Sequence, residues 1–414
     1  MLANVLKALP GEASHKVTVA ALSKGIHPRY SPIQLPTEIG ALRFPNPIGL
    51  AAGFDKNGEA ISGCFALGFG SVEIGTVTPL PQPGNPKPRV FRLPEDGAFI
   101  NRYGFNSDGM EAVAARLSKW RKCNKTDQLI GVNIGANNIT ENKVEDYFSA
   151  CLGLAGLADY LTINISSPNT FGLRDLQKAS FLKQIIKSVK LALVEANLVK
   201  PIFIKLDPDL NKSDLFSAIE VMINEGIAGV IISNTTLSRN NLKNRKNIKQ
   251  TGGLSGVPLF RLSSEKLSEA YIFAEGHISF IGVGGISSIK DAYTKILLGA
   301  DILQLYSSLA LKGPHIANHI NIGLAKLCVG EGINNLKEVC GSFNSFSKAQ
   351  RHAEHIKNTD GCLLVACCDI IENKAIELAE KHGASHHVSM DEMLINADID
   401  IISICSPNGL HAEH

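Results

Sequence analysis

Eight short runs of valine, isoleucine and leucine, separated by segments with helical periodicity, constrain the fold of this chain more than any other feature. Between most of them, apolar residues recur about every 3.6 positions and charged residues occupy the remaining face, which predicts helices. The alternation predicts a (β/α)8 barrel of parallel strands, a TIM barrel, whose chemistry lies on the loops that follow the strands. The expected strands are Pro47–Gly53, Ser71–Thr78, Leu129–Gly135, Tyr160–Ser167, Pro201–Leu206, Gly229–Thr236, Phe280–Gly285 and Ile302–Ser308, and the clearest helices are Ser180–Val194, Asp214–Gly226 and Ser288–Gly299.

Polar side chains cluster where these strands end. In the fourth strand, the apolar run from Leu161 passes directly into Asn164, Ser166, Ser167 and Asn169. An amide or hydroxyl left unpaired in an apolar site costs about 1–3 kcal/mol, so we expect a polar, ring-shaped ligand as partner. An open doubly wound sheet is the alternative fold, but such sheets seldom need eight parallel strands with converging polar tips. The other polar strand ends are Lys56, Thr76, Thr78, Asn133, Lys205, Asn234 and Thr235.

Glycines mark the last strands. The seventh strand carries Gly282, Gly284 and Gly285 before a helix, and the eighth ends in Tyr306 and Ser307. Glycine lets the backbone approach a phosphate and leaves N–H groups to hold it, and TIM barrels commonly bind phosphate at this position. A further run, Thr251–Gly256, follows the sixth strand. The pattern favours a mononucleotide such as FMN.

Composition fits an enzyme with no nucleic-acid partner, because 41 basic residues are balanced by 39 acidic residues. The nine cysteines lack paired metal-ligand spacing, so we predict reduced structural thiols and no metal site. We find no apolar run of about 18 residues, as a membrane span requires, and no signal peptide at the N-terminus.

Several motifs in this order resemble the quinone-dependent class of dihydroorotate dehydrogenases, over residues 1–341. The resemblance implies an FMN enzyme of UMP biosynthesis that oxidises dihydroorotate to orotate and passes the electrons to a membrane quinone. It is also compatible with a monomer. The motifs are Ala51–Gly58, Glu73–Pro79, Pro81–Arg89, Asn101–Asn106, Asn164–Asn169, Asn234–Thr236 and Thr251–Gly256.

The resemblance assigns Ser167 as the base that removes the C5 proton of dihydroorotate while hydride leaves C6. Serine is a weak base, so it would need a relay and a dry site. The soluble relatives that use fumarate or NAD carry cysteine instead. A hydroxyl that caps the strand end, as serine before proline often does, is the structural alternative.

The resemblance also implies the remaining site residues. Lys56 would contact both flavin and substrate, and Lys205 would hold the negative charge of the reduced flavin, although either lysine alone could be a surface charge. Ser233 replaces a threonine that is frequent in the family and keeps the hydroxyl. The cofactor set is Ala52, Gly53, Lys56, Thr76, Asn133, Asn164, Lys205, Ser233, Gly256, Gly285, Tyr306 and Ser307. The substrate set is Lys56, Asn101, Arg102, Tyr103, Gly104, Phe105, Asn164, Asn169, Asn234 and Thr235.

The first 34 residues form the expected N-terminal extension. Met1–Ile26 predicts two amphipathic helices broken at Pro10-Gly11, one with Leu2, Val5, Leu6 and Leu9 on its apolar face and the next with Val17, Ala20 and Ala21. They could simply pack on the barrel. The resemblance instead implies a tunnel for the quinone tail and peripheral attachment to the cytoplasmic face of a bacterial inner membrane.

Residues 35–341 form the expected FMN-binding barrel, and 342–414 a separate segment. Leu363–Asp369, a helix at Ala375–His382, Ser389–Leu394 and Ile399–His411 resemble the N-terminal Rossmann half of the glucose-fructose oxidoreductase and inositol dehydrogenase superfamily. Asp369 matches the ribose-binding acid, but residues 342–350 lack the first strand and its glycine motif.

We therefore expect a truncated Rossmann-like fragment without dehydrogenase activity. A bifunctional enzyme with a second, NAD-linked site is one alternative. A barrel that has become a flavin-binding module without chemistry is another, but none of the expected base and amide residues is missing.

Overall fold

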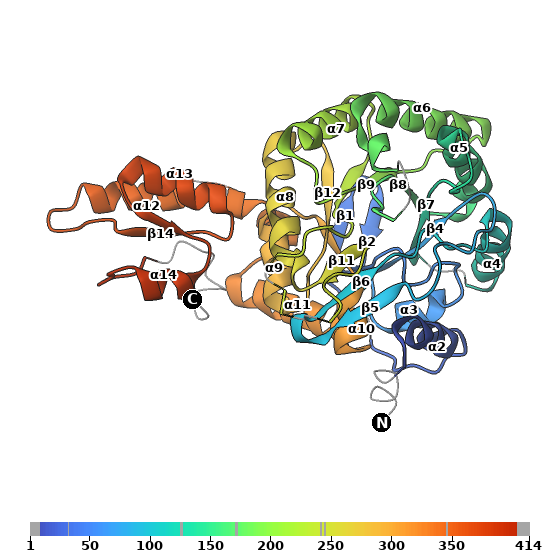
Figure 1. Cartoon of the computed structure of the whole chain (residues 1–414), viewed down its shortest axis with the longest axis horizontal. Coiled ribbons are helices and arrows are strands. Elements are labelled where there is room, and N and C mark those ends of the chain that lie inside the picture. The colour runs from blue at the N-terminus through green and yellow to red at the C-terminus, as the bar shows by residue number, and fades with distance from the viewer. Residues whose placement is uncertain are drawn as a thin grey trace.

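Eight parallel strands close into a barrel in the computed structural model, which describes residues 9–31, 33–124, 127–169, 173–240, 242–243, 246–344 and 347–403 (Figure 1). Each strand pairs with its neighbours in chain order, and β13 pairs with β3 to complete the ring. All eight predicted strands and the TIM-barrel fold are confirmed. The barrel strands are β3 (Ile48–Leu50), β4 (Ser71–Val77), β7 (Leu129–Ile134), β8 (Tyr160–Asn164), β9 (Ile202–Leu206), β10 (Gly229–Ile232), β12 (Ser279–Val283) and β13 (Ile302–Leu305).

Helices surround the barrel because each buries one apolar stripe against the strands. In α6, the buried side chains include Leu182, Ile185, Ile186 and Val189, which is the spacing of one helix face. The three helices predicted most clearly from the sequence correspond to α6, α7 and α9. The helices of this layer are α3 (Ile61–Ala66), α4 (Met110–Cys123), α5 (Lys143–Leu154), α6 (Ala179–Glu195), α7 (Lys212–Asn224), α8 (Leu259–Ala274), α9 (Ile289–Leu297), α10 (Ser307–Lys312) and α11 (Ile316–Glu331), with 3-10 turns at Pro94–Asp96, Ala155–Leu157, Arg174–Gln177, Leu336–Glu338 and Ser342–Asn344.

A hairpin closes the amino-terminal end of the barrel. Strands β1 (Thr37–Ile39) and β2 (Leu42–Phe44) pair antiparallel, and their buried side chains join a core cluster with Tyr160 and Phe203 from inside the barrel. The opposite end, where the strands finish, is left for a ligand.

A second sheet covers part of that carboxyl end, and the sequence did not predict it. Strands β5 (Val90–Leu93) and β6 (Ala98–Asn101) form a hairpin, and β11 (Gly253–Gly256) adds to β6 antiparallel. The sheet has its own small core that includes Leu93, Ile100 and Leu254. Its pairing joins segments that are far apart in the chain, so local patterning does not reveal it.

The N-terminal extension contains α2 (Gly11–Ser23), as predicted for the second helix, whereas residues 1–8, which hold most of the first predicted helix, lie outside the described residues. Val19 and Leu22 are the buried residues of α2, and Leu22 packs against Gly63 of α3, where a Cβ would lie 2.7 Å from the Leu22 carbonyl oxygen. Of the three residues expected on its apolar face, Val17 is 47 % exposed, and Val17 and Ala21 line a cavity described below. No helix of the described chain is both long and apolar enough to span a membrane.

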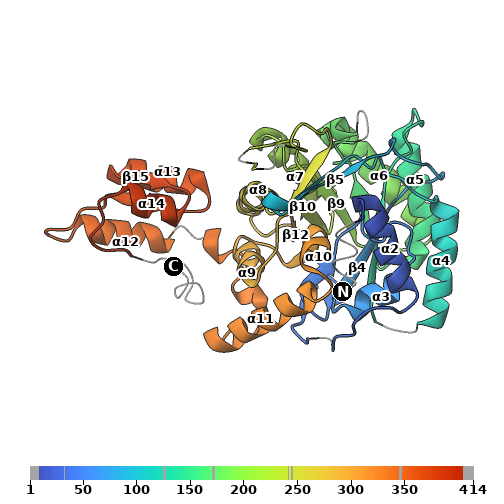
Figure 2. The same ribbon diagram turned by 60° about the horizontal axis from the view of Figure 1, so that its bottom comes forward.

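The C-terminal segment forms a small lobe beside the barrel (Figures 1 and 2). Its strands β14 (Ala366–Cys368) and β15 (Ser385–His387) pair parallel, and they are accompanied by α12 (Ser347–Lys357), α13 (Glu372–His382) and α14 (Met390–Asn396). This is the incomplete Rossmann-like unit that the sequence predicted. The predicted helix at Ala375–His382 is confirmed within α13.

The lobe leaves apolar side chains in solvent: Leu363 is 80 % exposed and Ile395 is 82 % exposed. Of the predicted strand Leu363–Asp369, only β14 forms, because the strand that would flank it in a complete fold has no counterpart among the described residues. Residues 399–403 are not in a strand, and Ile404–His411 lies outside the described residues. Contacts with the barrel include a 2.9 Å ion pair between Arg261 and Glu372.

Candidate active site

A cavity of about 1170 Å³ lies at the carboxyl end of the barrel and extends to α2. Residues in or directly after every barrel strand except β7 line it, together with residues of the β5-β6-β11 sheet. This is the end of a TIM barrel where the loops carry chemistry. The cavity is therefore the candidate active site.

The structure brings nearly all of the predicted site residues to this cavity. Two do not line it. Asn133 lies fully buried beneath it, and the Arg102 guanidinium donates to Gln250 Oε1 at 3.0 Å and to the Pro88 carbonyl at 3.0 Å. The predicted residues that do line it are Ala52, Gly53, Lys56, Thr76, Asn101, Tyr103, Gly104, Phe105, Asn164, Ser167, Asn169, Lys205, Ser233, Asn234, Thr235, Gly256, Gly285, Tyr306 and Ser307.

A chain of hydrogen bonds runs from the barrel interior to the cavity. Glu73, a fully buried carboxylate, accepts from Asn133 Nδ2 at 2.9 Å and from Gln304 Nε2 at 2.7 Å. Asn133 Oδ1 then accepts from Thr76 Oγ1 at 2.6 Å, and Thr76 Oγ1 accepts from Asn164 Nδ2 at 2.8 Å. Each polar group thus fixes the orientation of the next, which preorganises the floor of the site.

The same chain continues across to β10. Asn164 Oδ1 accepts from Ser166 Oγ at 3.2 Å, and Ser166 Oγ accepts from Asn234 Nδ2 at 3.0 Å. These bonds determine which amide edge each asparagine presents to the cavity. Sequence reasoning identified both asparagines but missed Glu73 and Gln304, although an acidic residue inside the apolar run Ser71–Val77 was an available signal.

Ser167 belongs to the loop that follows β8; it is buried, with 5 % of its surface exposed, and lines the cavity. Its Oγ accepts from the Asn169 backbone N–H at 3.2 Å. This is the cap interaction considered from the sequence, and it occupies one acceptor site of the hydroxyl. The hydroxyl proton is not used by this bond, so the cap and a role toward a ligand are compatible.

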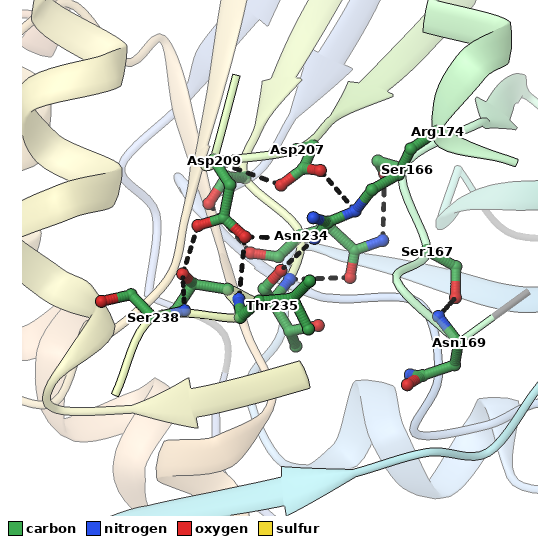
Figure 3. A network of polar contacts seen from close by, with 12 residues as sticks. Ser166, Ser167, Asn169, Arg174, Asp207, Asp209, Asn234, Thr235 and Ser238 are labelled. Atoms are coloured by element: carbon green, nitrogen blue, oxygen red, sulfur yellow. Dashed lines mark hydrogen bonds and ion pairs between the residues drawn. The ribbon is translucent and has the colours of Figure 1, made fainter. Parts of the chain in front are cut away.

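A cluster of charges joins the loop that carries Ser167 to the loops after β9 and β10 (Figure 3). Arg174 forms an ion pair with Asp207 and a second, at 3.2 Å, with Asp209. Asp209 in turn accepts from the Thr236 hydroxyl and from the Leu237 N–H. Burial raises the pKa of Asp207 to about 7, against the opposing effect of Arg174. Sequence reasoning did not identify this cluster.

Two lysines supply positive charge to the cavity. Lys56 Nζ lies 4.4 Å from the centre of the Tyr103 ring, and burial, assisted by the charge of Arg89, lowers its pKa to about 8. Burial also lowers the pKa of Lys205, while the charge of Glu73 opposes that shift. Both side chains can therefore meet an anionic group inside a largely enclosed site.

The glycine-lined end of the cavity can accept a phosphate. Gly285 has φ +75° and a Cβ there would lie 2.4 Å from Phe260 N; Gly256 has φ +102° and a Cβ would lie 2.3 Å from the Gly97 carbonyl oxygen. Only glycine fits at either place. The buried Ser308 Oγ, which belongs to a lining residue, has no hydrogen-bond partner in the described chain. A mononucleotide phosphate fits this donor set.

Helix α2 forms one wall of the cavity entrance. Arg89, which is 5 % exposed, donates from Nε and Nη2 to both carboxylate oxygens of Glu12 at 3.1 Å and 2.9 Å. His15 also lines the cavity, and burial lowers its pKa to about 4, so its ring is neutral near pH 7. Sequence reasoning missed these contacts, which depend on how the extension packs.

The barrel, the polar floor of its cavity and the glycine-lined end are typical of a TIM-barrel enzyme, with donors and acceptors that suit a small polar ligand beside a phosphate-bearing group. A family model described as "Dihydroorotate dehydrogenase" matches residues 34–328. The chain belongs to the dihydroorotate dehydrogenase family, and its relatives are of the quinone type. The resemblance seen in the sequence is thereby confirmed, as is its consequence that the chain is an enzyme.

Individual relatives of this chain support the same family. "Dihydroorotate dehydrogenase (quinone)" of Parvibaculum lavamentivorans is 45 % identical over 334 residues, which cover 80 % of this chain and 94 % of the relative. The mitochondrial quinone enzyme of Oryza sativa is 44 % identical, over 81 % of this chain and 77 % of its own. The crystal structure of the Eimeria tenella enzyme in complex with ferulenol has a TM-score of 0.77 at 36 % identity, covering 81 % of this chain and 96 % of that chain.

A second family model, described as "Oxidoreductase family, NAD-binding Rossmann fold", matches residues 338–414. This match confirms the resemblance of the C-terminal lobe, which the fold already shows to be an incomplete Rossmann-like fragment.

Proposed function

We propose that this enzyme uses FMN to oxidise (S)-dihydroorotate to orotate and passes the electrons to a membrane quinone, as a step of UMP biosynthesis. One observation carries the proposal: a serine, a set of fixed amides and two lysines line a single cavity with a glycine-lined phosphate end. The relatives named as quinone-dependent dihydroorotate dehydrogenases support it.

The substrate would lie against the amide side of the cavity. Asn101, Asn164, Asn169 and Asn234 can both donate and accept, which suits a ring that bears carbonyls, N–H groups and a carboxylate. Thr235 adds a hydroxyl. Lys56 would pair with the carboxylate. Arg102, which follows β6, would act indirectly, since its guanidinium joins the segments that precede β5 and β11 through its bonds to Pro88 and Gln250.

Ser167 would act as the base that takes the C5 proton of dihydroorotate, while the hydride would leave C6 for the flavin. General-base assistance of this kind contributes about 10²–10⁴-fold. The hydroxyl is buried, and its Oγ is oriented by the Asn169 N–H. Placing the proton acceptor in a dry, fixed position is what the β8 loop contributes to the reaction.

FMN, when bound, accepts the hydride and later releases the electrons to the second substrate. Gly256, Gly285, Tyr306 and Ser307 would hold its phosphate end, and Ala52, Gly53 and Thr76 would follow its ring. Ser233 and the amide of Asn164 complete the contacts. Lys205, buried beside the barrel floor, would stabilise negative charge on the ring. Asn133 would act indirectly, through its hydrogen bond with Thr76.

The quinone would enter past the N-terminal extension. The cavity reaches α2 and is lined there by apolar residues such as Val17, Ala21 and Leu22. An amphipathic extension of this kind suits peripheral attachment to a membrane, which we propose to be the cytoplasmic face of a bacterial inner membrane. We also propose that the chain acts as a monomer.

The chain would divide into the extension (1–34), the FMN-binding barrel (35–341) and a C-terminal fragment (342–414) without dehydrogenase activity. The family match over 34–328 and the two-stranded sheet of the C-terminal lobe support this division. Asp369 lies after β14, yet residues 342–350 supply no glycine turn for a pyrophosphate.

The experiment that tests the proposal compares electron acceptors. The purified chain is expected to show the visible absorption of bound FMN, and to oxidise dihydroorotate with a short-chain soluble quinone but not with fumarate or NAD. Turnover that depends on fumarate or NAD would move the enzyme to the soluble type. A colourless protein that does not bind added FMN would refute the proposal.

A further inference from the structure

Lys295 is a fully buried lysine that the proposed function has not used. It lies in α9 and is among the largest side chains with essentially no exposed surface. Within the described part of the chain it has no ion pair with a carboxylate, although the charge of Asp291, one turn earlier in the same helix, acts on it. Burying an ammonium group without a paired carboxylate is costly, so such a residue calls for a specific reason.

The Lys295 ammonium points to the first turns of α8. Its Nζ donates to Ser263 Oγ at 2.8 Å and lies 5.3 Å from the centre of the Phe260 ring. Ser263 Oγ lies within hydrogen-bond distance of the Gly284 carbonyl, at 3.0 Å, and of the Phe260 carbonyl, at 3.1 Å. The lysine therefore fills an acceptor site of the serine, and the serine proton is directed to a carbonyl.

Gly284 belongs to the turn that forms the phosphate end of the cavity. Gly284 and Gly285 have φ +109° and +75°, and both line the cavity. A Cβ on Gly284 would lie 2.8 Å from Ser263 Oγ, and one on Gly285 would lie 2.4 Å from Phe260 Cα. The turn is thus pressed against the part of α8 that Lys295 holds.

Positive potential accumulates behind this turn. The N-terminus of α8, a helix of 16 residues, begins at Leu259, which also lines the cavity, and its free N–H groups carry a partial positive charge. Lys295, when protonated, adds a positive charge from the other side of the same turn, which it reaches through Ser263. The unpaired, buried Ser308 hydroxyl at this end of the cavity is an independent sign that a ligand group belongs here.

We propose that Lys295 is a positioning residue for the phosphate of the cofactor: through Ser263 it holds the Gly284–Gly285 turn in place and adds attraction for the anion. This inference rests on the proposed FMN function and extends it to a residue that does not line the cavity. Burial lowers the pKa of Lys295 to about 7, and a bound phosphate would favour its charged form.

The test measures FMN and riboflavin binding by flavin fluorescence, on the full-length chain after removal of its own flavin. Riboflavin lacks the phosphate. The variants are Lys295→Met and Ser263→Ala, and the matched controls are Lys290→Met, an exposed lysine of the same helix, and Ser264→Ala, a buried neighbouring serine whose hydroxyl has no partner in the described chain.

We expect both variants to weaken FMN binding by about tenfold and to leave riboflavin binding within about twofold of wild type, the scale of one hydrogen bond to a charged group. The controls should keep the wild-type preference for FMN. Unchanged FMN binding in both variants, or equal losses for FMN and riboflavin, would overturn the inference. If Lys295→Met does not fold, the FMN and riboflavin affinities of Ser263→Ala alone test the inference. Failure of the wild type itself to bind FMN would instead refute the proposed function.

Discussion

Removing the Arg174 guanidinium should destabilise the barrel, and a second substitution, Asp207→Asn, should restore part of the lost stability. Arg174 pairs with Asp207, whose side chain is 3 % exposed, whereas that of Arg174 is 26 % exposed. Breaking a buried ion pair from one side costs about 3–5 kcal/mol, because the remaining charge is left uncompensated. Because Arg174 is partly exposed, the cost of breaking this pair should be smaller. We expect Arg174→Leu to lower the free energy of unfolding by about 2–3 kcal/mol.

Arg174→Leu leaves the buried carboxylate of Asp207 without its cation. Asp207→Asn removes that carboxylate and should therefore recover part of the stability. After Arg174→Leu, the Asp207 carboxylate still accepts from the Asp209 N–H at 2.9 Å, but no cation is left to pair with it in this cluster. The double variant should therefore be more stable than Arg174→Leu alone, with a coupling energy of about 2 kcal/mol. Urea unfolding followed by tryptophan fluorescence suits the measurement, since the single tryptophan, Trp120, lies in α4 of the barrel.

The loss should also depend on pH. Burial raises the folded-state pKa of Asp207 from 3.8 to about 7, so the folded state retains a proton that the unfolded state releases, and stability falls as pH rises between these values. The charge of Arg174 opposes this rise, so removing Arg174 should raise the pKa of Asp207 further. Stability would then continue to fall up to a higher pH than in the wild type. The difference in stability between wild type and Arg174→Leu should therefore be larger at pH 8 than at pH 6. A double variant no more stable than Arg174→Leu, or a loss independent of pH, would refute the reasoning.

Three further outcomes are expected. Ser167→Ala should slow reduction of the bound flavin by dihydroorotate about 10²–10⁴-fold while the flavin content stays at the wild-type level; a rate near wild type would exclude Ser167 as the base. Arg89→Met should loosen α2 from the barrel and slow reoxidation by quinone more than reduction by dihydroorotate, as separate anaerobic half-reactions would reveal; equal effects on both would argue against a quinone path along α2. A chain that ends at Asn344 should retain flavin and dihydroorotate oxidation, measured side by side with the full chain, and loss of flavin on truncation would mean that the C-terminal lobe supports the barrel.

The barrel could be predicted from the sequence because each of its strands is a contiguous apolar run, buried on both faces. The signal is local, so no knowledge of packing is needed. The β5-β6-β11 sheet could not be predicted in the same way. Its third strand reads Gly253–Gly256, with two glycines in four residues, and pairs with Ala98–Asn101, so its formation depends on contacts between distant loops.

Most of the side chains that face the cavity could be predicted from the sequence, since they follow the ends of predicted strands. The residues that hold these side chains in place could not be predicted. Glu73 lies inside a strand, and Lys295 and Ser263 lie on helices of the outer layer; they reach the site only through packing. Arg102 illustrates the converse case, because its position in a matched motif suggested a ligand contact, whereas its guanidinium bonds to neighbouring loops.

The most direct test of the central claim is an anaerobic titration of the purified chain with dihydroorotate, followed by addition of a soluble quinone. The proposed function predicts that the visible flavin band bleaches with about one equivalent of dihydroorotate per bound flavin and returns when quinone is added. A flavin band that dihydroorotate does not bleach, or that quinone does not restore, would contradict it.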